Sequence, residues 1–314
     1  MLECAFPMTA SNIFVDSSGK LRSGWRATAF VVAFLFCAKV LEAIASVLIS
    51  FAGQDRAVAL SHGSWSYIIG ALVLLGSATL VGWACGRIFE ELPFRSLGWS
   101  PHAGWFKNLL VGSVIGAGSL LLAAGFTAIT RGIRFSFDQA GAGNIGLTAI
   151  VSAIIFVIAA SGEEALFRGY PLQTFTRARL AWVGILLTSM PFAAAHLYNP
   201  HANRSFTFIN TAVAGVWLGA AYLRTRSLWF PIGLHWGWNW TQASLLGLPV
   251  SGIERIAPAP LLHAMNAGPD WLTGGAYGIE GGAACTVALA ISTVIVWRTK
   301  FVSTAKTISE TRNS

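Results

Sequence analysis

The stretch that decides the fold is IIFVIAASGEEALFR, residues 154–168. It begins as an apolar run and ends in two adjacent glutamates, Glu163 and Glu164, followed by Arg168. Apolar helical runs of about 17 to 25 residues cross the hydrocarbon core of a bilayer, which is roughly 30 Å thick. A charged side chain at that depth costs at least a few kcal/mol, so each carboxylate needs a partner or a function.

The rest of the chain is of the same apolar kind. Its 314 residues are 54% hydrophobic and 11% charged, with a mean hydropathy of +0.62, whereas soluble domains carry about 25% charged residues. The sequence therefore predicts an all-α fold, a polytopic membrane helix bundle. About eight transmembrane helices are expected, over residues 25–50, 66–88, 106–130, 145–172, 181–198, 206–224, 228–248 and 282–298.

The polar motifs divide this bundle into three regions. Residues 1–140 hold about three helices in which no motif indicates a role. Residues 145–248 form a core of four helices that carries every motif considered below. Residues 249–314 supply the last span and a polar tail.

The distribution of basic residues indicates the orientation. A net charge of +8 alone would be compatible with nucleic-acid binding. If the N-terminus is cytoplasmic, however, most of the 21 Lys and Arg fall on one side, as the excess of positive charge in cytoplasmic loops requires. We therefore expect no nucleic-acid partner, both termini in the cytoplasm and an even number of spans.

Two features of the apolar segments indicate helix packing rather than chemistry. Lys39 and Glu42 are three residues apart in the first span and can neutralise each other on one helix face. Small residues at four-residue spacing let helices approach closely in lipid. Such pairs are Gly82/Gly86, Gly112/Gly116 and Gly215/Gly219.

The charges of residues 154–168 do not cancel, because one arginine follows two carboxylates. On a helix Glu164 and Arg168 are four residues apart, with the glutamate first, which is the favourable order for an ion pair. Glu163 points about 100° away from Glu164. We expect Arg168 to hold Glu164, leaving Glu163 to face the interior. A charge cluster at the end of the helix is the simpler alternative.

Two histidines and an asparagine favour a site. His196 lies in PFAAAH, residues 191–196, with Phe192 one turn earlier, and a lone histidine there would be a packing residue. His235 lies in FPIGLHWGWN, residues 230–239, and shares a helical face with Asn239. A glutamate can activate water as a general base, and an amide N–H can stabilise an oxyanion. One glutamate and two histidines also form a known zinc ligand set, so Zn²⁺ bound by Glu163, His196 and His235 stays open beside metal-free chemistry.

These motifs resemble a known family. EExxxR at 163–168, FxxxH at 192–196 and HxxxN at 235–239 are similar, in order and spacing, to the three motifs of the CAAX protease and bacteriocin-processing (CPBP) family of intramembrane proteases. The resemblance covers residues 145–245. It implies hydrolysis of peptide bonds at the membrane, with prenylated CAAX proteins or bacteriocin-type precursors as substrates. The resemblance thus implies a peptidase, and the charge bias, together with the absence of organelle signals, favours a bacterial inner membrane as its location.

The resulting hypothesis assigns a role to each residue. Glu163 activates a water with help from His196, while His235 and Asn239 stabilise the oxyanion. Arg168 orients Glu164 and the end of the helix. Two other readings are kept: a transporter or channel with a Glu/His relay, and a non-catalytic immunity or binding protein in the membrane.

Overall fold

The fold is helical with one small sheet. A computed structural model describes residues 11–16, 19–52, 54–61, 63–202, 204–254 and 256–305, so the end of the predicted tail, 306–314, lies outside the described residues. The helices are α1 Ser11–Phe14, α2 Ser23–Ser50, α3 Gln54–Ser61, α4 Gly63–Glu90, α5 Trp105–Ile129, α6 Ala142–Phe167, α7 Tyr170–Arg177, α8 Ala181–His196, α9 Phe206–Thr225, α10 Trp229–Trp240, α11 Asp270–Thr273 and α12 Ala283–Arg298. Shorter helical turns are η1 Phe94–Leu97, η2 Thr241–Leu245, η3 Gly275–Tyr277 and η4 Ile279–Gly281, and the strands are β1 Ile133–Phe137 and β2 Leu262–Asn266.

Each of the eight predicted spans contains a helix, but the number of spans is not confirmed. Within the described residues, five helical segments are long and apolar enough to cross a membrane: α2, α4, α5, α6 together with α7, and α9. α8 and α12 have 16 residues each, and α10 has 12. At 1.5 Å per residue, 16 residues span about 24 Å, less than a hydrocarbon core of roughly 30 Å. The architecture is thus a membrane helix bundle.

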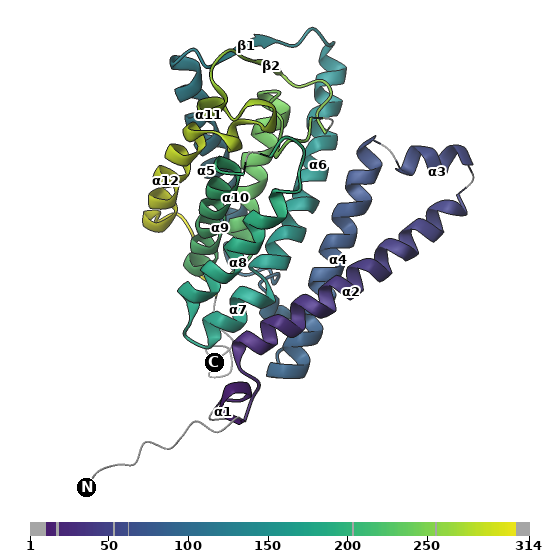
Figure 1. Ribbon diagram of the computed structural model, residues 1–314, viewed down its shortest axis with the longest axis vertical. Helices are drawn as coiled ribbons and strands as arrows, with labels where there is room; N and C mark the ends of the chain where they lie inside the picture. Colours follow the sequence, from purple (N-terminus) through teal and green to yellow (C-terminus); the bar gives the residue numbers. More distant parts are fainter. Residues whose placement is uncertain are drawn as a thin grey trace.

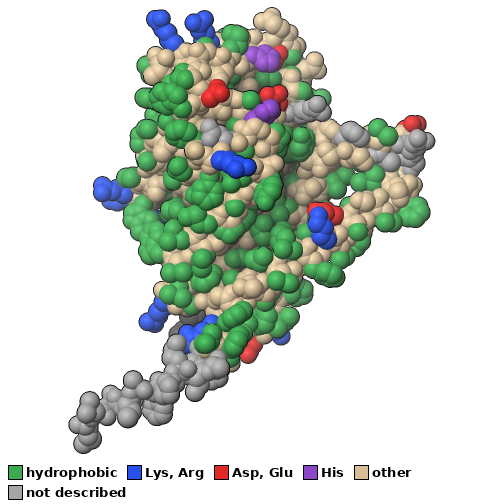
Figure 2. Space-filling view, in the orientation of Figure 1, with side chains coloured by type: hydrophobic (Ala, Val, Ile, Leu, Met, Phe, Trp, Pro, Cys, Tyr) green, Lys and Arg blue, Asp and Glu red, His purple; other side chains and the backbone are tan. Residues whose placement is uncertain are grey.

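The helices form a bundle and an arm. In Figure 1, α5, α6, α8, α9, α10 and α12 lie together, while α2 and α4 form an arm that diverges from them toward α3. Hydrophobic side chains cover much of the bundle and the arm on the face in Figure 2, as expected of surfaces that meet lipid. The predicted pair Lys39–Glu42 lies on the exposed side of α2, with Nζ 2.7 Å from the carboxylate.

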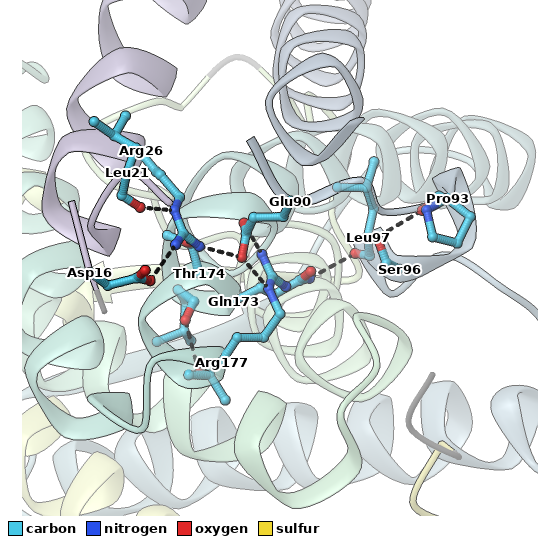
Figure 3. A network of polar contacts seen from close by, with 12 residues as sticks. Asp16, Leu21, Arg26, Glu90, Pro93, Ser96, Leu97, Gln173, Thr174 and Arg177 are labelled. Atoms are coloured by element: carbon cyan, nitrogen blue, oxygen red, sulfur yellow. Dashed lines mark hydrogen bonds and ion pairs between the residues drawn. The ribbon is translucent and has the colours of Figure 1, made fainter. Parts of the chain in front are cut away.

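A buried charge network fastens the arm to the bundle at the end where α2 begins (Figure 3). The Glu90 carboxylate, at the end of α4, lies 2.6 Å from Arg26 of α2 and 2.7 Å from Arg177 of α7. Arg26 also lies 3.6 Å from Asp16 and hydrogen-bonds Thr174. Because Arg26 and Glu90 are less than 10% exposed, the network joins three helices in a buried position.

Glycines bring α5 and α10 into backbone contact. A Cβ added at Gly112 or Gly116 of α5 would lie within 3.0 Å of α10 backbone atoms, and one at Gly237 of α10 would meet the backbone of Ser113 equally closely. The predicted packing role of Gly112 and Gly116 is therefore confirmed. This contact fixes the depth of α10, the helix that carries His235.

Segments that the sequence did not predict as structure cover the end of the bundle opposite the charge network (Figure 1). Strands β1 and β2 pair antiparallel, with Ile133 opposite Asn266 and Phe137 opposite Leu262. We call residues 246–282, which contain β2, α11, η3 and η4, the cap. Cap residues Val250, Ile256 and Leu272 are buried, so the cap is packed against the bundle.

Candidate active site

Glu164 is the buried centre of the site. It lies in the last turn of α6, its side chain is fully buried, and its Oε1 lies 3.2 Å from Nη1 of Arg168, as expected from their spacing. Arg168 is also buried; its second terminal nitrogen donates to the Gly215 carbonyl, and its guanidinium lies over the Phe192 ring at 4.6 Å. The pair therefore links α6 to α8 and α9.

His235 shares the Glu164 carboxylate. Its Nδ1 donates to Glu164 Oε1 at 2.9 Å, so its Nε2 is directed elsewhere, and that atom lies 3.7 Å from Glu163 Oε2. Two tryptophans of the same helix hold α10 against α6. Trp236 donates to the Ala153 carbonyl, and Trp240 donates to the Ala149 carbonyl. The imidazole is thus fixed between the two glutamates.

His196 ends α8 and is oriented by its own helix. Its Nδ1 lies 2.7 Å from the Phe192 carbonyl, which can only accept, so Nδ1 carries the proton. A neutral ring in this tautomer keeps the lone pair of Nε2 free to accept a proton or a ligand. Phe192 packs on His196 at 4.6 Å between ring centroids and lies edge-on to His235 at 6.3 Å.

One cavity collects the predicted residues. Its volume is about 340 Å³, and Glu163, His196, His235 and Asn239 line it together with Phe192. Glu163 is partly exposed to it, with 26% of its side chain accessible, whereas Glu164 is not exposed. The two adjacent glutamates therefore differ as expected: Glu164 is enclosed by Arg168 and His235, and Glu163 faces the cavity.

Several other polar residues that are not motif positions also line the cavity. Trp217 of α9 and Trp238 of α10 lie in its wall, and so do Ser251 and Glu280 of the cap. The cap residues carry no signal in the sequence, because single polar residues in an irregular segment have no periodicity to mark them.

The side chains do not form a metal site as they are placed. Among the described residues, no three or more His, Cys, Asp or Glu side chains are grouped so that they could hold a metal ion. The predicted donor set of Glu163, His196 and His235 shares a cavity but does not meet around one point.

Comparison with known proteins agrees with these motifs. Residues 144–241 match the model of the Rce1-like family, the type II CAAX prenyl endopeptidases. An Escherichia coli protein described as an uncharacterized 24.3 kDa protein is 35% identical over 97 residues, which cover 30% of this chain and 41% of the relative. All six predicted site residues lie inside the matched segment. Residues 144–241 of this integral membrane protein are thus similar to the Rce1-like type II CAAX prenyl endopeptidase family, consistent with the CPBP resemblance of its motifs.

Proposed function

We propose that the protein is an intramembrane endopeptidase that cleaves lipidated, CAAX-like or membrane-associated peptides with a water activated by Glu163. The observation that supports this most is the shared cavity, in which a partly exposed glutamate, two oriented imidazoles and an amide face the same space. The family match supports a membrane protease and does not favour a transporter or an immunity protein.

The first step is attack by water. Glu163 accepts a proton from a water whose second hydrogen is bonded to Nε2 of His196, the ring nitrogen that the Phe192 carbonyl leaves free. The water oxygen bonds to the carbonyl carbon of the scissile peptide. General-base catalysis of this kind contributes about 10²–10⁴-fold to the rate.

The second step is collapse of the tetrahedral intermediate. The oxyanion accepts hydrogen bonds from the amide of Asn239 and, when the imidazole carries both protons, from Nε2 of His235. Glu164 accepts from Nδ1 of the same ring and so keeps Nε2 directed at the cavity. Glu163 then gives its proton to the leaving nitrogen, the C–N bond breaks, and a carboxylate and an amine are released.

The location and substrates follow from the family and the charge pattern. Arg26, Arg177 and Arg224 lie at the end of the bundle where α2 begins and α9 ends, and Lys and Arg are retained on the cytoplasmic side. We therefore place both termini in the cytoplasm, in a bacterial inner membrane, and the similar Escherichia coli protein supports a bacterial source. The proposed substrate is a prenylated or bacteriocin-type precursor that reaches the site from the lipid.

Three variants test the proposal: Glu163→Gln, His196→Ala and His235→Ala, reconstituted in liposomes and assayed on a lipidated peptide. Each should lose at least about 10²-fold in cleavage rate. Glu42→Gln, on the exposed face of α2, is the matched control and should cleave at the unaltered rate. Full activity in all three site variants would refute the proposal.

Zinc bound by Glu163, His196 and His235 stays a prediction. Metal analysis of the purified protein would measure its zinc content. Zinc in equimolar amount that disappears in His196→Ala would support ligation by this set. Unaltered activity after chelation, with no bound metal, would support the metal-free mechanism.

A further inference from the structure

The cap contributes a second carboxylate to the cavity of Glu163. Glu280 lies in η4, beyond the residues that match the family, and lines the cavity together with Ser251. No Lys or Arg lines the cavity among the described residues, and Arg168 is committed to Glu164. Among the described residues the cavity therefore presents two carboxylates and no lysine or arginine.

The bonds of Glu280 fix its carboxylate without neutralising it. Oε1 accepts from Nε1 of Trp238 at 3.2 Å, and Oε2 accepts from the backbone N–H and the hydroxyl of Ser251 at 2.6 and 3.0 Å. None of the ion pairs of the described residues includes Glu280. A carboxylate has about four acceptor positions, so three neutral donors leave capacity toward the cavity.

The backbone of Glu280 is held as firmly as its side chain. Asn210 of α9 donates to the carbonyls of Glu280 and Gly282, and its own oxygen accepts from Thr286. Burial, and then the nearby Glu280 charge, raise the pKa of Tyr277 above its usual value, so that this neighbour stays a neutral phenol. The carboxylate is thus presented at a fixed position.

A free donor lies in the same wall. Trp217 is 2% exposed, lines the cavity, and its indole N–H has no hydrogen-bond partner. Its ring meets Trp238 edge-on at 5.9 Å. A buried polar group without a partner costs about 1–3 kcal/mol. An incoming peptide carbonyl would remove that cost, which points to a ligand at this wall.

This wall is close to the catalytic residues. Trp238, which donates to Glu280, follows His235 by three residues on α10, a displacement of about 4.5 Å along the helix and about 60° around it. An extended peptide advances about 3.3 Å per residue. A peptide bound at His235 and Asn239 would therefore bring a residue within a few positions of the scissile bond to Glu280.

We propose that Glu280 and Trp217 form a substrate subsite that binds a positively charged group, a lysine or arginine side chain or a free amino terminus, with Glu280 pairing the charge and Trp217 donating to a peptide carbonyl. This specifies the substrate class of the proposed protease and so rests on that function. In a cavity shielded from water the attraction between the charges is stronger than at a surface.

The test measures peptide binding rather than cleavage. It therefore detects binding at the subsite whether or not the protein is a protease. Fluorescent lipid-anchored peptides carrying lysine or its uncharged analogue norleucine are titrated into liposomes holding Glu163→Gln protein. The lysine peptides should bind at least tenfold more tightly. A further Glu280→Gln exchange should reduce that preference below threefold. Glu254→Gln, which removes an exposed carboxylate of the cap that does not line this cavity, should preserve it.

Two peptide forms separate the sources of charge. Acetylated lysine peptides report the side chain, and norleucine peptides with a free amino terminus report the α-amine. Equal binding of charged and uncharged peptides to Glu163→Gln protein would overturn the proposal. An equal loss of affinity for charged and uncharged peptides on Glu280→Gln exchange would overturn it too. If Glu280→Gln fails to fold, a photoreactive group beside the lysine should crosslink to the cap in protein that retains Glu280; crosslinks confined to other segments would overturn it.

Discussion

Arg168 and His235 enclose Glu164 so completely that its charge depends on both of them. Because Arg168 is 1% exposed and Glu164 is fully buried, water cannot solvate the charge of either side chain. The two neighbouring glutamates therefore take different roles because of their direction on the helix, one turned to the guanidinium and one to the cavity.

Loss of Arg168 should destabilise the protein strongly. Arg168→Met leaves the buried Glu164 with His235 as its remaining partner and without its guanidinium. Breaking a buried pair in this way costs about 3–5 kcal/mol. Thermal unfolding in detergent should show a clear fall in midpoint temperature. Lys39→Met, which breaks the exposed pair on α2, is the control and should change stability by at most about 1 kcal/mol. Equal small effects would contradict the burial argument.

Loss of the Asn239 amide should slow catalysis with little effect on binding. Its side chain lines the cavity and forms no hydrogen bond with the described residues, so it is available to a developing oxyanion. Asn239→Ala should lower kcat about 10²–10³-fold, as removal of one oxyanion donor does, and leave KM within a few-fold. A rise in KM at constant kcat would assign Asn239 to substrate binding instead.

The predictable and unpredictable parts of the site differ in kind. The pairing of Glu164 with Arg168 follows from helical spacing alone. The depth of His235 could not be predicted from spacing. Counted from Arg226 along an unbroken helix, His235 is expected nearer the cytoplasmic side than Glu163. The structure brings the two together because α6 ends at Phe167 and the chain turns at Gly169 into α7, which shortens the path from Glu163 to the turn.

Helix α10 depends on α5 for its position, since their backbones touch through glycine. Gly116→Ala places a methyl group within 3.0 Å of Leu234 backbone atoms and should cost about 1–3 kcal/mol as overpacking. It should also lower activity, because α10 carries His235 and Asn239. Gly118→Ala in the same helix is the control: an added Cβ there meets nothing within 4 Å. Equal stability of the two variants would show that α5 and α10 are not in backbone contact.

Elements of low periodicity could not be predicted. The apolar helices were visible in hydropathy, and the small-residue pair Gly112/Gly116 indicated a contact without naming its partner. The cap was not visible, because its short strands and turns are held by contacts with residues far away in the sequence, such as Asn210 with Glu280. Glu280 and Ser251 are consequently polar residues of the cavity that no motif could reveal.

For the molecule as a whole, the arm is fastened to the bundle by the network of Arg26, Glu90 and Arg177 (Figure 3). Glu90→Gln should remove the nearest carboxylate of the buried Arg26, leave it with Asp16 at 3.6 Å, and loosen α2. Limited proteolysis at the start of α2 would detect this loosening as faster cleavage. Glu91→Gln changes the adjacent exposed glutamate and should leave the digestion pattern unaltered. Identical protection in both variants would mean that apolar contacts alone hold the arm.

The central claim is that Glu163, and not its buried neighbour, is the carboxylate that activates water. Its most direct measurement is the cleavage rate of a bound, lipid-anchored peptide by Glu163→Gln protein in liposomes, under single-turnover conditions with peptide binding measured in parallel. We predict unaltered folding, peptide affinity within threefold, and a rate at least about 10²-fold lower, the contribution of a general base. A rate within threefold of the unaltered protein at equal peptide occupancy would contradict the account.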